Sequence, residues 1–167
     1  AIISHPDAGK TTLTEKLLLY SGLIRTAGMV RGRKGGKTAA SDWMGMEQER
    51  GISITASAMQ FPYKEAVINL LDTPGFLYFQ GDAIAGLTAA DGALVTVGAA
   101  TGVEAGTERM FREAMARKDP VLFVVSMMDK DHADFDRAYR MIKERVTAKV
   151  VPVEIPIGAG AGLTGVM

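Results

Sequence analysis

The sequence predicts an α/β domain with a mainly parallel sheet, one antiparallel edge hairpin and helices on both faces. Strand-like apolar runs alternate with amphipathic helical segments along the chain. The runs at 92–99 and 120–125 are continuously apolar, which is typical of strands covered on both faces. The runs at 54–61 and 66–71 are joined by only four residues, too few for a parallel crossover, so these two strands should pair antiparallel.

The first elements set this alternation. A short apolar strand over 1–4 leads through a turn to a helix over 10–20. Leu13 and Leu17 share one face of that helix, because they are four residues apart. Gly22 follows and is a suitable residue for ending it.

The rest of the chain continues in the same way. We expect a mobile glycine-rich loop over 25–51 with a partial helix near 41–49, helices over 104–117 and 134–146, and a strand over 149–155. Asp134 is a candidate N-cap, because its carboxylate can accept a hydrogen bond from the first turn of its helix.

Composition limits the function classes. The 167 residues provide for one domain, with 19 basic and 19 acidic side chains. The balanced charge gives no general case for nucleic acid, and we expect no direct DNA binding. No cysteine and only two histidines are present, which argues against disulfides and zinc. The apolar runs are short of the ~20 residues of a membrane helix, so we expect a soluble, cytoplasmic monomer without a membrane partner.

A phosphate-binding loop is predicted between the first strand and the first helix. Ser4-His5-Pro6-Asp7-Ala8-Gly9-Lys10-Thr11 matches the pattern Gly-x-x-x-x-Gly-Lys-Ser/Thr except at its first residue. Main-chain N–H groups of the loop and the helix start can converge there on a phosphate, while Gly9 permits close approach. Lys10 would neutralise phosphate oxygens and Thr11 would bind Mg²⁺. The alternative is a chance Gly-Lys-Thr, with Thr11 and Thr12 only capping the helix.

Two further segments fit the same site. Asp72 ends a predicted strand and could bind Mg²⁺, while the N–H of Gly75 could approach a γ-phosphate. Taken alone, Thr73-Pro74-Gly75 is equally typical of an ordinary turn. Ser53, at the end of the long loop, offers a second hydroxyl to the metal, as in loops that order when γ-phosphate is bound.

These motifs together resemble the G domain of translational GTPases. The resemblance lies in residues 4–12, in Glu47-Gln48-Glu49-Arg50-Gly51-Ile52-Ser53-Ile54 and in Asp72-Thr73-Pro74-Gly75. The stretch from Ser41 to Tyr63 is similar to bacterial peptide-chain release factor GTPases. Residues 89–93, 102–109 and 152–158 resemble elongation factor G, which we favour, and the similarity extends over nearly the whole chain.

That resemblance implies a P-loop NTPase fold, GTP or GDP with Mg²⁺ as ligands, and the ribosome as partner. It further implies a G domain over 1–167 that is incomplete at both ends, with residues 156–167 starting the insertion found in that domain. The resemblance implies catalytic roles for Lys10 and Gly75, and metal binding by Thr11, Ser53 and Asp72. It implies nucleotide binding by His5, Pro6, Asp7, Ala8, Gly9, Lys10, Thr11, Thr12, Asp72, Thr73, Pro74, Gly75 and Asp129.

The sequence departs from the family pattern at two functional positions. Phe76 stands where the family has a histidine that places the attacking water, so we expect slow hydrolysis. Ser126-Met127-Met128-Asp129 stands for Asn-Lys-x-Asp, leaving Asp129 to read guanine. Met127 could lie over the base, while Met128 could equally be a core residue.

Other readings remain open at this point. The basic cluster of Arg31, Arg33, Lys34 and Lys37 could meet ribosomal RNA or could be a solvated loop. Instead of a GTPase, the chain could be a nucleotide- or ribosome-binding regulator that has lost turnover. It could also be a P-loop ATPase, because the guanine-reading motif is altered.

Overall fold

The computed structural model describes residues 1–27, 39–40, 47 and 52–167. Its helices and strands are β1 (Ile2–Ser4), α1 (Lys10–Tyr20), β2 (Ser57–Tyr63), β3 (Ala66–Asp72), the 3₁₀ turn η1 (Leu77–Phe79), α3 (Gln80–Ala89), β4 (Ala93–Gly98), α4 (Ala105–Arg117), β5 (Val121–Ser126), α5 (Phe135–Arg145), β6 (Pro156–Ile157), the 3₁₀ turn η2 (Gly160–Gly162) and β7 (Gly165–Val166). The basic cluster at 31–37 and nearly all of the expected partial helix lie outside the described residues.

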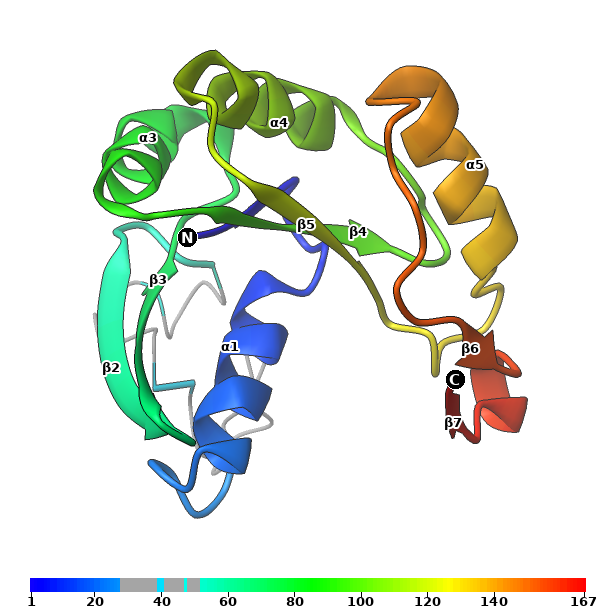
Figure 1. Cartoon of the computed structure of the whole chain (residues 1–167), viewed down its shortest axis with the longest axis horizontal. Coiled ribbons are helices and arrows are strands. Elements are labelled where there is room, and N and C mark those ends of the chain that lie inside the picture. Colours follow the sequence, from blue (N-terminus) through cyan, green and yellow to red (C-terminus); the bar gives the residue numbers. More distant parts are fainter. Residues whose placement is uncertain (28–38, 41–46, 48–51) are drawn as a thin grey trace.

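A five-stranded sheet in the order β2-β3-β1-β4-β5 organises the chain (Figure 1). β1 runs parallel to β3 and β4, β4 runs parallel to β5, and β2 pairs antiparallel with β3 at the edge. The predicted mainly parallel sheet with one antiparallel hairpin is therefore confirmed. Because β1 lies centrally, the loop after it opens at the carboxyl edge, where β3 and β4 also end.

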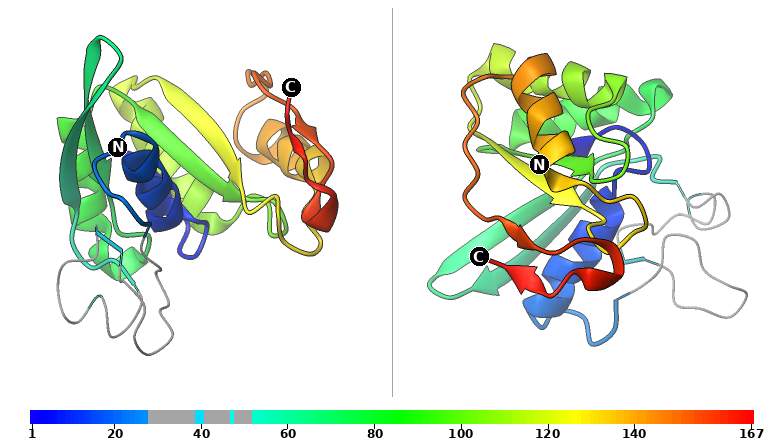
Figure 2. Two further views of the ribbon diagram at one scale, coloured as in Figure 1. Left: turned by 90° about the horizontal axis from the view of Figure 1, so that it is seen from below. Right: turned by 90° about the vertical axis from the view of Figure 1, so that its right-hand side faces the viewer.

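Helices lie on both faces of the sheet (Figure 2). On one face α1 packs against β1 and β3, and a core of Ile2, Leu18, Phe61 and Leu70 forms beneath it. On the other face, α3, α4 and α5 contribute to a larger core with β1 and β4. The helix termini nearest the phosphate loop are fixed by these two cores.

Cover by helices is complete for β4 but not for β5. Five of the six β4 residues are buried, whereas Leu122 of β5 is 52% exposed. The reason is that α1 contacts β1 and β3 rather than the far edge of the sheet. The continuous apolar run at 120–125 thus predicted the strand correctly but overstated its burial.

Two local differences from the sequence prediction are informative. β2 starts at Ser57 rather than at 54, because the N–H groups of Ile54 and Thr55 donate to the Glu47 carboxylate instead of to a strand. The strand expected over 149–155 is wrong. In the described chain the sheet in that region is the short β6–β7 hairpin, which Ile155 extends by pairing with Met167.

The helix α3 has no clear signal in the sequence. Its residues, QGDAIAGLTA, include two glycines and an apolar side that is hard to tell from a buried strand. None of the helices in the described part of the chain has the combined length and apolar character that a membrane span requires.

Candidate nucleotide site

The loop between β1 and α1 leads into the start of that helix at the carboxyl edge of the sheet. Asp7 (φ 58°) and Gly9 (φ 87°) both take left-handed backbone conformations, which bend the loop round the helix axis. Among the described residues, no side chain caps α1, and its first turn has no acidic residue. The N–H groups and positive dipole end of α1 are thus available to an anion.

Lys10 is the central cation of this loop. Its side chain is only 6% exposed, and its ammonium donates to Ser4 Oγ at 3.1 Å and to the His5 carbonyl at 3.2 Å. Burial lowers the pKa of Lys10 to about 8, although the nearby carboxylates of Asp72 and Asp7 act in the opposite direction. A desolvated ammonium with neutral acceptors is favourably placed to meet phosphate oxygens.

The turn after β3 closes over Lys10. A Cβ added at Gly75 would collide with Lys10 Nζ and would lie 3.0 Å from the Pro6 main chain, so any other residue there would displace Lys10 or the loop. Thr73 is fully buried, and its hydroxyl donates to the Ile2 carbonyl at 2.7 Å, which ties the turn to β1. Pro74 is buried as well. The structure thus brings Lys10 and Gly75 together as the motif predicted.

Oxygen atoms that could bind Mg²⁺ lie near the start of α1. Thr11 Oγ1 lies 3.2 Å from Ser53 Oγ, although the two residues are 42 positions apart. Asp72, 2% exposed at the end of β3, is close enough to Lys10 to raise its pKa. Two hydroxyls and a carboxylate are hard oxygen ligands of the kind that Mg²⁺ takes together with phosphates and water. The residues present therefore fit the metal that the motifs imply.

The last residue of β5 and the residue after it contact the phosphate loop directly. Ser126 Oγ donates to the Ala8 carbonyl at 2.7 Å, and Met127 lies against Gly9. The serine that stands in place of the family's asparagine thus bonds the phosphate loop. The side chain of Asp129 is 68% exposed, with Lys130 Nζ at 4.0 Å. The Asp129 carboxylate is thus accessible to a guanine base. Met128 is only partly buried.

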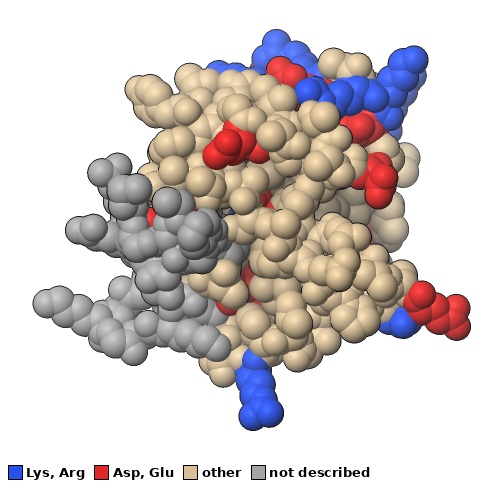
Figure 3. Space-filling view, turned by 90° about the vertical axis from the view of Figure 1, so that its left-hand side faces the viewer, with Lys and Arg blue, Asp and Glu red and all other residues tan. Residues whose placement is uncertain are grey.

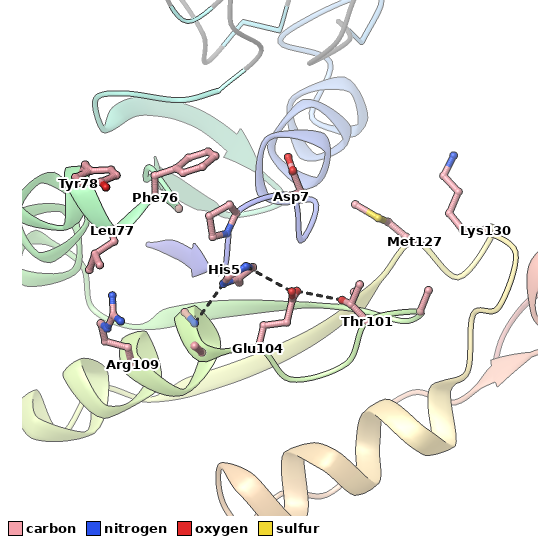
Figure 4. Close-up of a pocket in the computed structure, with 16 residues that line it drawn as sticks. His5, Asp7, Phe76, Leu77, Tyr78, Thr101, Glu104, Arg109, Met127 and Lys130 are labelled. Atoms are coloured by element: carbon pink, nitrogen blue, oxygen red, sulfur yellow. Dashed lines mark hydrogen bonds and ion pairs between the residues drawn. The ribbon is translucent and has the colours of Figure 1, made fainter.

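A pocket of about 610 Å³ lies between the phosphate loop, the turn at 75–78 and the start of α4 (Figure 4). Phe76 lines it, as does His5. The Nδ1 of His5 accepts from the N–H of Gly106 at 3.3 Å, and its Nε2 lies 3.4 Å from Glu104 Oε1. With both nitrogens engaged, His5 links the phosphate loop to the start of α4 and is not poised as a base.

Comparison with known proteins agrees with this geometry. The model of the family described as "Elongation factor Tu GTP binding domain" matches residues 1–167. The chain belongs to that family. The resemblance to the G domain of translational GTPases is therefore confirmed, and with it guanine-nucleotide binding as the function class.

A solved structure gives the same result for the fold of this G domain. The protein ttk003000868 from Thermus thermophilus superimposes with a TM-score of 0.90 at 29% sequence identity. The match covers 99% of the present chain and 24% of the Thermus chain, so the G domain spans about a quarter of that protein's length. The predicted P-loop NTPase architecture is confirmed.

The predicted site residues do not all face the same point. Lys10, Thr11, Ser53, Asp72 and Gly75 gather at the carboxyl edge of the sheet. By contrast, the side chains of Thr12, Asp7 and Asp129 are exposed to solvent. Ala8 is buried, and its carbonyl accepts the Ser126 bond. The contribution of each one to nucleotide binding is a prediction that the geometry permits.

Sequence reasoning missed three contributors to the site. Glu47 anchors the residues on both sides of Ser53. Glu104 and Gly106 fix His5. Only Glu104 left a local signal, since it begins the capping box Glu104-x-x-Thr107 at the start of α4. Gly106 meets His5 from 101 residues away, which no periodicity encodes. Glu47 contacts Ile54 and Thr55 only seven and eight positions along the chain, but the motif at 47–54 does not indicate which atoms pair.

Proposed function

We propose that the chain is the guanine-nucleotide-binding domain of an elongation factor G-like translational GTPase. It would couple GTP binding and hydrolysis to ribosomal translocation or recycling in the cytoplasm, acting as a monomer. The observation that carries the proposal is the buried ammonium of Lys10, enclosed by Gly75 and adjoining the Thr11–Ser53 hydroxyl pair. Residues 156–167, which form the β6–β7 hairpin, are proposed to begin an insertion within the domain.

Each part of the nucleotide has a proposed partner. The loop amides, the α1 N-terminus and Lys10 bind the phosphates, since they offer hydrogen-bond donors and positive charge together. The side chains of Thr11, Ser53 and Asp72 surround the metal site, where bound Mg²⁺ supplies neutralisation of phosphate charge. The exposed carboxylate of Asp129 reads the N–H groups of guanine.

Hydrolysis should be slow for a reason visible in the site. Phe76 follows Gly75 and lines the pocket beside the phosphate loop, and its phenyl ring can neither donate nor accept a hydrogen bond. Positioning of water is a principal part of catalysis in phosphoryl transfer. His5 offers no replacement, because Gly106 and Glu104 occupy its two nitrogens. Turnover would therefore depend on the ribosome.

The proposed ribosomal partner is supported by charge distribution as well as by resemblance. Lys and Arg side chains gather along the upper edge of one face, on the side where α4 lies, with Asp and Glu side chains among them (Figure 3). The α4 sequence includes Arg109, Arg112 and Arg117. The cationic side chains on this edge favour contact with RNA phosphates, although Arg117 is paired with Glu113 and the chain as a whole is neutral.

Two other functions are each favoured by one observation. Phe76 favours a nucleotide- or ribosome-binding regulator without turnover. The replacement of Asn-Lys by Ser126-Met127 favours an ATPase, because two residues of the guanine-reading motif are absent. Both share the phosphate site and differ from the main proposal in base preference or in hydrolysis.

Titrations with fluorescent GDP and ADP in the presence of Mg²⁺ test the proposal. We expect tighter binding of GDP, loss of binding in Lys10→Ala, and unchanged binding in Lys16→Ala, because Lys16 is an exposed lysine of the same helix. Preference for ADP, or unchanged GDP affinity in Lys10→Ala, overturns the proposal. Binding of GTP without ribosome-stimulated phosphate release supports the regulator.

A further inference from the structure

Glu47 is a fully buried carboxylate outside the phosphate loop, with 0% of the residue exposed. Its Oε1 accepts hydrogen bonds from the N–H of Ile54 at 2.9 Å, the N–H of Thr55 at 3.0 Å and the hydroxyl of Thr55 at 3.3 Å. Its main-chain carbonyl accepts from the N–H of Ile52 at 3.3 Å. A carboxylate tolerates such burial when several donors surround it.

These bonds bracket Ser53. Ile52 is bound to the main chain of Glu47 and Ile54 to its side chain, so the backbone on both sides of Ser53 is attached to one residue. Ser53 Oγ then lies 3.2 Å from Thr11 Oγ1 in the first turn of α1. The place of the Ser53 hydroxyl is therefore set jointly by Glu47 and by α1.

We propose that Glu47 is a positioning residue for the Mg²⁺–triphosphate state, acting by presenting Ser53 to the metal beside Thr11. The inference rests on the proposed function. Mg²⁺ demands nearly ideal octahedral geometry, so a small displacement of one ligand weakens the site. The ammonium of Lys10, which binds phosphates, is instead held by Ser4 and His5 within the loop itself. The loss should therefore fall on the triphosphate and spare the diphosphate.

The test compares Mg²⁺ complexes of GDP and of a nonhydrolysable GTP analogue in the full chain. Removing the acceptor for two main-chain donors in Glu47→Ala should weaken analogue binding about tenfold or more and raise the Mg²⁺ midpoint, with GDP affinity within about twofold. Glu47→Gln, which keeps an acceptor oxygen, should restore most of the affinity. Thr55→Val is the matched control, because it removes only the hydroxyl that shares Oε1.

A double-mutant cycle separates positioning from a purely structural role. In a Ser53→Ala background, Glu47→Ala or Glu47→Gln should cause no additional loss of analogue binding, because its effect passes through that hydroxyl. If Glu47→Ala shows no cooperative unfolding transition, Glu47→Leu, which fills the buried volume but offers no acceptor oxygen, provides the same cycle. Equal loss of GDP and analogue, or additive losses with Ser53→Ala, overturns the inference. Failure of the unmodified chain to bind either nucleotide overturns the proposed function itself.

Discussion

The hydroxyl of Ser126 donates a 2.7 Å hydrogen bond to the main-chain carbonyl of Ala8, which is 118 residues earlier in the chain. Because Ser126 ends β5 and Ala8 lies in the phosphate loop, this bond joins the segment proposed to read the base to the segment proposed to bind the phosphates. Gly9 fits closely beneath it, since an added Cβ would lie 3.2 Å from Ser126 Oγ. The two halves of the nucleotide site are thereby fixed relative to each other.

Ser126→Ala should destabilise the domain and weaken GDP binding. The buried Ala8 carbonyl would lose its donor, at a cost of about 1 to 3 kcal/mol. For a chain of this size each kcal/mol lowers Tm by roughly 2 to 4 °C. Thermal unfolding and GDP titration measure both effects.

The control for Ser126 is Thr164→Ala. Its hydroxyl also donates to a main-chain carbonyl, that of Ile157 at 3.2 Å, but in an exposed hairpin. Solvent can replace that bond, so Tm and GDP affinity should hardly change. A Ser126→Ala chain indistinguishable from this control would show that the tie to Ala8 is unimportant.

Nucleotide affinity should decrease as the pH rises above 8. Burial lowers the pKa of Lys10 to about 8 in the free chain, and bound phosphates would raise it again because they favour the ammonium. Binding therefore takes up a proton between those two pKa values, so affinity is fully present below pH 8 and declines above it. The decline approaches about tenfold per pH unit.

Calorimetric titration of GDP from about pH 7 to about pH 9.5, in buffers of different ionisation enthalpy, measures this uptake. Lys16→Met, on the exposed side of α1, should leave the profile unchanged. A flat profile for the unmodified chain would mean that Lys10 keeps its proton throughout or makes no contact with phosphate.

Gly75→Ala should weaken nucleotide binding, whereas Gly81→Ala should leave binding unchanged and stabilise its helix. At Gly75 the added methyl collides with Lys10 Nζ and approaches Pro6. Because this displaces a phosphate contact, we expect GDP affinity to fall about tenfold or more. A tenfold change in affinity corresponds to about 1.4 kcal/mol. At Gly81, in α3, nothing lies within 4 Å of the methyl. That change should stabilise the helix by about 0.5 to 1 kcal/mol. Equal GDP affinity in both variants would contradict the assignment of Gly75.

Phe76→His should accelerate GTP hydrolysis on ribosomes. An imidazole at this position can hydrogen-bond to the attacking water. A positioned acid–base group typically raises the reaction rate roughly 10²- to 10⁴-fold, and we expect the rate of GTP hydrolysis to rise about tenfold or more. Release of phosphate with and without ribosomes is the measurement. Tyr78→His is the control, because Tyr78 is 92% exposed two residues along the same turn. No gain over that control would mean that Phe76 does not limit turnover.

Local patterns were sufficient for the elements that build the nucleotide site. The helix at Lys10–Tyr20 was predicted with its observed bounds, since glycine, lysine and the leucine spacing all act within a few residues. Asp134 caps α5 as expected, accepting from the N–H of Arg137 at 2.8 Å. The antiparallel pairing of β2 with β3 followed from the short connection alone.

The features that the sequence did not predict depend on contacts with residues outside the segment itself. The start of β2 is displaced because Glu47 captures the N–H groups of Ile54 and Thr55. The stretch at 149–155 has the alternating apolar pattern of a strand, but in the described chain it has no neighbouring strand to pair with before Ile155 meets Met167. A pattern that predicts a strand cannot provide its partner.

The bridge from His5 to the first turn of α4 has a mechanical consequence. The His5 imidazole, with Gly106 N–H at 3.3 Å and Glu104 Oε1 at 3.4 Å, joins the start of this outer helix to the loop whose amides face the phosphates. A displacement of α4 would therefore also act on the phosphate loop. Such a displacement is expected to raise the dissociation rate of the nucleotide while the fold remains intact.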